Sequence, residues 1–194
     1  AERMEKRMQP EEIQAIFAGA ADFETHTVIA GGQTVTVFFI DGLTSGSEIA
    51  DFVIRPLGAM GEGSMEDVLA RAKNGAVWCA SVSSAKTPDE AAEKLVNGFC
   101  VAVFPGQPEA LCFETKTGEK RGVSAPEAEN TVKGAKDAFT ETLRTNTSLI
   151  RRHLRTPRLR LEQHTIGTQS LTCVTICYIA GTTDMRRVAR LRKR

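Results

Sequence analysis

Residues 35–46 read VTVFFIDGLTSG, a nearly continuous apolar run that ends in an aspartate–glycine turn. An uninterrupted apolar run of this kind is typical of a β-strand that is covered on both faces of its sheet. Before it, residues 23–29 form a second β-type run, and the intervening Ala30-Gly31-Gly32 supplies a hairpin turn. After it, apolar residues recur at helical spacing through residue 57. The stretch therefore predicts a hairpin followed by a helix.

The same order recurs near the end of the chain. LEQHTI at residues 161–166 matches FETHTV at 23–28, and YIAGTT at 178–183 matches FIDGLT at 39–44 after a slip of one residue. Each half thus reads as a hairpin followed by a helix. We therefore predict an α/β fold of two small subdomains, in which mixed β-sheets are flanked by helices.

The boundary between the subdomains is expected within residues 115–135, which are polar with scattered Gly and Pro. We divide the chain there into an N-terminal α/β subdomain, residues 1–123, and a C-terminal α/β subdomain, residues 124–194. In the second subdomain, the spacing of apolar residues predicts a helix over residues 137–154.

The composition is that of an ordinary globular protein, since 41% of the 194 residues are hydrophobic and 25% are charged. These values exclude fibrous, low-complexity and largely disordered classes. No window approaches the roughly 18 continuous apolar residues of a membrane helix. The charged N-terminus lacks the apolar core of a signal peptide.

No pattern in the sequence indicates catalysis, a metal or a cofactor. No Ser/His/Asp or Cys/His set for nucleophilic catalysis is present, so we predict that the protein is not an enzyme. The cysteines lie in apolar runs without C-x-x-C spacing, so no metal is expected. As small hydrophobes in β-type runs, they are expected to be buried and unreactive, which favours a reducing compartment. These cysteines are Cys79, Cys100, Cys112, Cys173 and Cys177.

The formal net charge of +1 conceals a strong asymmetry along the chain. Residues 151–194 contain 11 Lys or Arg and two acidic residues, whereas the first 150 residues contain 14 basic and 22 acidic residues. Nucleic acid is disfavoured as a partner, because no aromatic residues are interleaved with the arginines for base stacking. The acidic part of the same chain or of another subunit is the expected partner. The basic residues of the last helix also fit a positive flank leading to a membrane.

Several stretches resemble one known family, the GerA-type spore germination proteins that serve as A subunits of nutrient germinant receptors. The most specific stretch is FTETLRTNTSLIRR at residues 139–152. SAPEAE at 124–129 and Lys133-Gly134 add to it, as do FIDGL at 39–43 and IRPL at 54–57. The similarity covers most of the chain from about residue 35 onward.

The resemblance implies a place and a role for the chain. It implies the cytoplasmic domain of an A subunit, on the spore-core side of the spore inner membrane, with a transmembrane region beyond Arg194. It also implies assembly with B- and C-type receptor subunits and self-association in the full receptor. The expected role is non-catalytic, in receptor assembly and signal transmission. The alternative is a small-molecule binding domain with its ligand in a cleft between the two subdomains.

Residues 139–152, the stretch with the most specific resemblance to the family, supply the candidate residues for a contact between subdomains or subunits. Asn146 lies on the same predicted helical face as Phe139 and Ile150, where an unpaired amide would cost about 1–3 kcal/mol. We therefore expect the Asn146 amide to bond backbone of the other subdomain or of residues 124–135. The candidates of this run are Asn146, Arg144, Glu141, Arg151 and Arg152.

The turn after the apolar run is a candidate ligand loop. It follows a strand and opens a helix, a place where free N–H groups can meet an anion. The favoured alternative is a plain strand-to-helix connection with a Ser cap, because no phosphate-binding glycine motif is present. The candidate residues are Asp41, Gly42, Thr44 and Ser45.

Overall fold

The computed structural model describes residues 7–77, 81–116 and 138–193. The predicted boundary at residue 123 and the predicted burial of Cys79 lie outside these residues, as do residues 124–135, in which we expected a partner for Asn146. We call the described residues up to 116 the first lobe and residues 138–193 the second lobe. The division of the chain into two independent subdomains stays a prediction.

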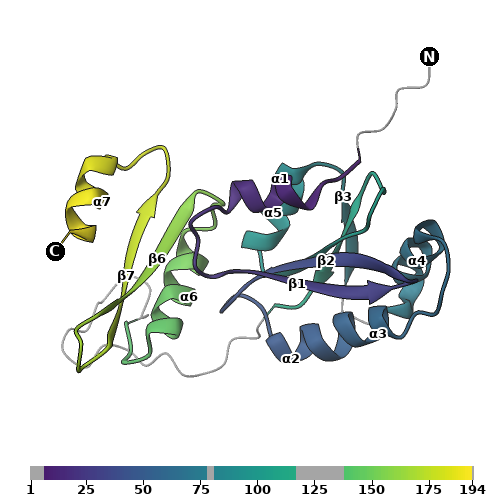
Figure 1. Ribbon diagram of the computed structural model, residues 1–194, viewed down its shortest axis with the longest axis horizontal. Coiled ribbons are helices and arrows are strands. Elements are labelled where there is room, and N and C mark those ends of the chain that lie inside the picture. The colour runs from purple at the N-terminus through teal and green to yellow at the C-terminus, as the bar shows by residue number, and fades with distance from the viewer. Residues whose placement is uncertain (1–6, 78–80, 117–137, 194) are drawn as a thin grey trace, which may run out of the picture.

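Five strands form the sheet of the first lobe, in the spatial order β1-β2-β4-β5-β3 (Figure 1). They are β1 (Phe23–Ala30), β2 (Gln33–Ile40), β3 (Val82–Ala85), β4 (Phe99–Val103) and β5 (Ala110–Glu114). As predicted, β1 and β2 form a hairpin, and Gly31 and Gly32 of its turn both have a positive φ. β2 therefore lies inside the sheet, between β1 and β4.

Helices cover both faces of this sheet, and β2 contributes to the core on each side. Val35 and Val37 pack into one cluster with Val53 and Leu57, whereas Phe38 packs into the other. α1 (Pro10–Ile16) and α5 (Pro88–Val96) supply the cluster around Phe38. The opposite cluster uses α2 (Gly46–Ile49), η1 (Ala50–Ile54), α3 (Arg55–Gly58), α4 (Met65–Arg71) and η2 (Ala72–Ala76). The apolar run at residues 35–40 is thus covered on both faces.

The second lobe contains a two-stranded ribbon of β6 (Leu159–Ile166) and β7 (Thr172–Ile179). α6 (Leu143–His153) lies between this ribbon and the first sheet, and α7 (Met185–Arg192) follows the ribbon (Figure 1). The predicted α/β class is confirmed, with a hairpin followed by a helix in each lobe. All ladders between the named strands are antiparallel, rather than mixed, because three hairpins account for most of the neighbouring strands.

Two local predictions in the second lobe differ from the structure. The helix begins at Leu143 instead of residue 137, so Phe139 precedes it and is 68% exposed. Cys100 and Cys112 are buried as expected, and burial raises the pKa of the Cys112 thiol to about 12. Cys173 and Cys177 are exposed, against the prediction, since β7 belongs to a two-stranded ribbon and none of its eight residues is buried.

Candidate functional site

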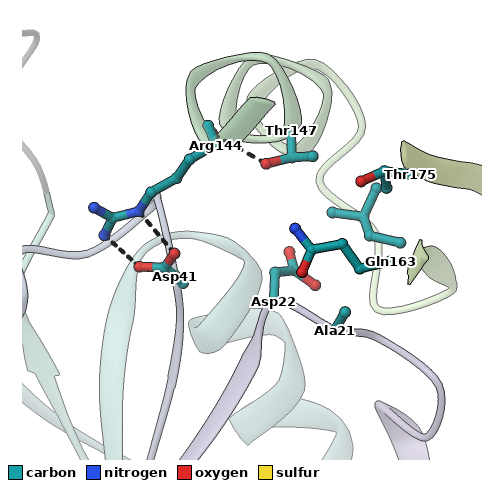
Figure 2. A pocket seen from close by; sticks show the side chains of 8 residues that line it. Ala21, Asp22, Asp41, Arg144, Thr147, Gln163 and Thr175 are labelled. Carbon is teal, nitrogen blue, oxygen red and sulfur yellow. Dashed lines mark hydrogen bonds and ion pairs between the residues drawn. The ribbon is translucent and has the colours of Figure 1, made fainter. Parts of the chain in front are cut away.

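The two lobes meet at a cavity of about 160 Å³. Its mostly polar lining comes from both lobes, as Figure 2 shows. The lining residues are Ala21, Asp22, Asp41, Arg144, Thr147, Leu161, Gln163 and Thr175. Asp41 and Arg144 are also candidates from the sequence. We call this region the interlobe junction and treat it as the candidate functional site.

A buried ion pair between Arg151 and Asp22 crosses the interlobe junction. Arg151 lies in the last turn of α6 with a fully buried side chain, and Asp22 directly precedes β1. The Arg151 Nε and Nη2 donate to the two Asp22 oxygens at 2.9 and 2.7 Å. The Arg151 Nη1 also donates to the carbonyls of Thr156 and Leu159, at 3.2 and 3.4 Å. These bonds offset the cost of removing both charges from water.

A second ion pair, Arg144–Asp41, joins the same lobes closer to solvent. Arg144 lies in the first turn of α6, and Asp41 directly follows β2. The Arg144 Nε donates to the Asp41 Oδ2 at 2.7 Å, and Nη2 donates to Oδ1. This hydrogen bonding, with the negative charge of Asp41, raises the pKa of Arg144. The two side chains are 65% and 35% exposed, and exposed pairs contribute only about 0–1 kcal/mol.

Gly42 allows α6 to approach the end of β2. Its φ is +83°, and a Cβ atom at this position would lie 2.0 Å from the Ser148 Oγ. The position therefore requires glycine for two reasons, its backbone conformation and the absence of a side chain. The Ser148 Oγ is held on its own helix, where it donates to the Arg144 carbonyl at 2.7 Å.

Two further contacts attach strand β6 to the first lobe. The Ala21 N–H donates to the Leu161 carbonyl at 2.9 Å. The Arg160 Nη2 donates to the Ile16 carbonyl at 2.8 Å. Burial lowers the pKa of Arg160. Both α6 and β6 of the second lobe therefore contact the first lobe.

Thr44 and Ser45 of the candidate ligand loop have structural partners. The Thr44 Oγ1 donates to the Ile40 carbonyl at 3.0 Å and is buried. The Ser45 Oγ accepts from the Glu48 N–H at 3.4 Å as the cap of α2, and the Ser45 N–H donates to the Thr115 carbonyl at 2.9 Å. These bonds agree with the favoured alternative, a strand-to-helix connection with a Ser cap. A ligand role for the loop stays a prediction.

Asn146 does not pair with the first lobe. Its Oδ1 accepts from the Thr140 N–H and its Nδ2 donates to the Thr140 carbonyl, both at 2.7 Å. The expected pairing with the other lobe is therefore wrong, because the segment before α6 folds back and supplies both bonds locally. Glu141 is exposed before the helix, and Arg152 is half-buried. Within the described residues, the structure shows neither side chain in a contact between lobes.

The remaining polar residues of the junction were not predicted from the sequence. Asp22, Thr147, Gln163 and Thr175 lie on four different segments, so no local pattern groups them. One signal was available for Asp22, which lies at the end of a predicted hairpin opposite Asp41. The Asp41 N–H does donate to the Asp22 carbonyl, at 2.8 Å.

The lining of the cavity suits an uncharged polar molecule better than an ion. Asp22 and Asp41 are each paired with an arginine, so their charges are compensated. The Thr175 Oγ1 is buried without a hydrogen-bond partner among the described residues. Hydroxyl and amide groups of the lining therefore remain the principal groups for binding a ligand.

A separate cluster around Glu162 attaches α7 to the ribbon. The Tyr178 hydroxyl donates to the Glu162 carboxylate at 2.5 Å, and the Arg192 Nε donates to it at 2.8 Å. Hydrogen bonding from Arg192 lowers the pKa of Glu162 to about 2. Glu162 thus joins β6, β7 and the last turn of α7.

Within residues 7–77, 81–116 and 138–193, no group of three His, Cys, Asp or Glu side chains is placed to bind a metal ion. In the same part of the chain, no helix combines the length and the apolar character needed to cross a bilayer.

Comparison with known proteins identifies related sequences. The family model of the Bacillus/Clostridium GerA spore germination protein matches residues 11–194. The uncharacterized membrane protein YfkQ of Bacillus subtilis is 28% identical over 158 residues, 81% of this chain and 31% of YfkQ. Spore germination protein KA of the same organism is 27% identical over 164 residues, 82% of this chain and 29% of that protein. The chain thus spans less than a third of the length of these two curated relatives.

A solved structure shares the fold. The N-terminal domain of the A subunit of the Bacillus megaterium spore germinant receptor GerK3 matches with a TM-score of 0.70 and 22% identity. The match covers 94% of this chain and 67% of the solved chain. The family-model match, which extends over nearly all of the sequence, confirms the resemblance seen in residues 139–152: the chain belongs to the Bacillus/Clostridium GerA spore germination protein family.

Proposed function

We propose that this chain is the non-catalytic N-terminal region of a germinant receptor A subunit, and that it contributes to receptor assembly and signal transmission in spore germination. The family match supports the assignment, and the observation that carries the proposed role in transmission is the buried Arg151–Asp22 pair between the lobes. A buried ion pair adds little net stability compared with apolar packing, but it tolerates few alternative geometries. The pair therefore fixes how one lobe sits on the other.

The two ion pairs of the interlobe junction differ in the free energy that is needed to separate them. Arg151–Asp22 is buried, so separating it leaves a charge out of water at high cost. Arg144–Asp41 is largely exposed, so its opening costs little. We infer that the buried pair acts as a pivot and the exposed pair as a latch. A ligand or partner that favours the open latch would shift the population of lobe orientations.

The partners and the location follow from the same proposal. We propose assembly with B- and C-type receptor subunits and with further copies of the A subunit. The region would lie on the cytoplasmic, spore-core side of the spore inner membrane. The fold that the chain shares with an A-subunit domain of the germinant receptor GerK3 supports the assignment to an A subunit.

Removal of the latch tests the proposed function. Arg144→Ala should leave the fold intact, since the pair is exposed, but should change the response of spores to nutrient and the distribution of lobe orientations. Arg55→Ala is the matched control, because it removes an exposed ion pair to Asp51 within the first lobe. The measurements are the germination rate of spores that carry the variant receptor and the small-angle scattering of the purified protein.

The charge-swapped variant Arg144→Asp with Asp41→Arg should restore both readouts in part, because it restores the pair with reversed polarity. Wild-type germination and scattering for Arg144→Ala would contradict the latch. Equal defects for Arg144→Ala and Arg55→Ala would show a nonspecific loss of surface charge instead.

A second candidate function is the binding of a small uncharged polar molecule in the interlobe cavity. The Thr175 Oγ1, which has no hydrogen-bond partner among the described residues, and the volume of about 160 Å³ favour it. This volume lies below the range of about 300–1,000 Å³ that is usual for drug-sized ligands, so the ligand would be small.

Thermal-shift measurements with sugars, nucleosides and amino acids test this candidate. A ligand that binds only the folded state raises the melting temperature as its concentration rises above its dissociation constant. Thr175→Val fills the same space without the hydroxyl and should abolish the shift. A shift that persists in Thr175→Val would place the ligand elsewhere, and no shift with any compound would count against binding.

A further inference from the structure

Strands β2 and β7 have similar sequences but opposite environments. β2 reads QTVTVFFI and β7 reads TCVTICYI. Each is the second strand of its hairpin, and each leads through a glycine of positive φ, Gly42 or Gly181, into a helix. Four residues of β2 are buried, whereas no residue of β7 is buried.

The two strands differ in what surrounds them, since β2 has helices over both faces and a strand on each side. β2 pairs with β1 on one side and with β4 on the other, where Thr36 lies opposite Val103 and Phe38 opposite Val101. Among the described residues, β7 pairs with β6 alone. An apolar strand that would be central in a larger sheet therefore lies at an edge (Figure 1).

The register identifies which backbone groups of β7 point away from β6. The Ala180 N–H donates to the Arg158 carbonyl at 2.8 Å, so these two residues form a hydrogen-bonded pair. Because such pairs alternate along an antiparallel ladder, the even-numbered residues of β7 form the hydrogen bonds to β6. The backbone groups of Cys173, Thr175 and Cys177 then point outward. When Phe39-Ile40 is aligned with Tyr178-Ile179, as in the sequence repeat, Thr175 and Cys177 correspond to Thr36 and Phe38. These are the two β2 residues whose backbone groups face β4.

This edge lacks the features that normally prevent strand addition. β7 contains no Pro or Lys, and it pairs with β6 over all eight residues without a bulge. Leu171 and Ile166, at the tip of the ribbon, are 65% and 53% exposed, and Val174 is 37% exposed. Within the described residues, this edge is thus unbroken by a bulge, rich in apolar side chains and not paired with a further strand.

We propose that the outer edge of β7 accepts an antiparallel strand that the same protein contributes after α7. Two observations support this occupant. In the first lobe, the strand that pairs with β2 comes later in the chain than the helix that follows β2. The match leaves about a third of the solved relative's chain uncovered, so that domain has further residues from which such a strand can be built.

A second copy of the edge is the competing occupant, and charge argues against it. Residues 151–194 contain 11 Lys or Arg against two acidic residues, so two copies paired at the uncharged strand β7 would bring two strongly basic segments together. A strand of the same chain avoids this repulsion if its sequence is neutral or acidic. The added strand would complete a three-stranded sheet that covers β7 as β4 covers β2.

Site-resolved hydrogen exchange tests the proposal, because it compares the outward and inward amides of one strand. The samples are the 194-residue chain and, as the proposal requires, a full-length protein with further residues after Arg194. In both, the Val174, Ile176 and Tyr178 amides should be protected by β6. The Cys173, Thr175 and Cys177 amides should exchange fast in the 194-residue chain and be slowed by at least roughly 100-fold in the full-length protein.

Fast exchange of the outward amides in the full-length protein would overturn the proposal. Protection that appears in the 194-residue chain and rises with its concentration would also overturn it, in favour of a second copy. Cys173→Pro provides an independent check, since Cys173 is exposed and the substitution removes an outward N–H only. It should leave the stability of the 194-residue chain nearly unchanged but lower that of the full-length protein, whereas Val174→Pro should disrupt the hairpin in both.

Discussion

At the scale of single residues, Gly42 is the most constrained position of the interlobe junction. In Gly42→Ala, the positive φ costs about 1–2 kcal/mol, and the new Cβ would lie 2.0 Å from the Ser148 Oγ. We expect a lower free energy of unfolding in urea and a weakened contact between α6 and the first lobe. Adding Ser148→Ala should recover the steric part of the loss but not the backbone part.

Gly46→Ala is the matched control for Gly42→Ala. Gly46 has no positive φ, and a Cβ there would meet no atom within 4 Å. Because alanine restricts the unfolded chain, this substitution should be neutral or slightly stabilising. If both alanine variants unfold at the same urea concentration, the close approach of α6 to Gly42 is not a constraint.

Glu162 predicts a pH dependence of stability at acidic pH. Its folded-state pKa of about 2 is below its ordinary value of 4.5, so the ionised form is favoured in the folded protein. The resulting stabilisation is fully present above about pH 4.5 and is lost as the pH falls towards 2. The difference in unfolding free energy between wild type and Glu162→Gln should therefore narrow below pH 4.5.

Denaturant titrations between pH 2 and pH 7 measure this difference. Glu24→Gln, at an exposed position of β1, is the control for the loss of one surface carboxylate. A difference between wild type and Glu162→Gln that stays constant across the whole range would refute the role of the Arg192 and Tyr178 contacts.

At the scale of secondary-structure elements, the cap of α5 is encoded locally, because Thr87-Pro88-Asp89-Glu90 has the pattern of a capping box with Pro at the first helical position. The Thr87 Oγ1 accepts from the Glu90 N–H at 3.2 Å, and the Glu90 carboxylate accepts from the Lys86 N–H at 2.7 Å. Thr87→Ala should cost about 1 kcal/mol. The loss should lower the melting temperature of the whole first lobe, since α5 places Leu95 in its core. Thr87→Ser should retain most of the stability, and a Ser variant as unstable as the Ala variant would contradict the capping role.

At the scale of the whole molecule, Arg151–Asp22 is the buried ion pair of the contact between lobes. Arg151→Met leaves the Asp22 carboxylate, which is 11% exposed, without its buried partner. Breaking a buried pair from one side typically costs about 3–5 kcal/mol. The double variant Arg151→Met with Asp22→Asn removes the uncompensated charge and should be more stable than Arg151→Met alone.

Chemical unfolding of the four proteins, wild type, both single variants and the double variant, gives the coupling energy of the pair. A double variant whose loss equals the sum of the two single losses would mean that Arg151 and Asp22 do not interact. Such additivity would remove the basis of the proposed pivot.

The sequence by itself determined the elements whose signals are local. The apolar run at residues 35–40, the glycine turn before it and the Thr87 cap each act within a few residues, so β2, its hairpin and α5 could be predicted. The repeat likewise revealed a second hairpin and helix. The family-like run also directed attention to Arg144 and Arg151, although not to their partners.

Only the tertiary structure decided which side chains meet. Asp22 and Arg151 are 129 residues apart, and their pairing depends on how α6 lies across the end of the β1–β2 hairpin. Asn146 shows the reverse case. Its position on the helix predicted a hydrogen-bond partner in a distant segment, but the backbone of Thr140, six residues earlier, supplies both bonds. Similarly, β2 and β7 are alike in sequence, but only β2 is buried, because helices cover both of its faces and a strand lies on each side. Local propensity is encoded over a few residues, whereas burial and ion pairing depend on distant segments, so the interlobe junction emerged only from the fold.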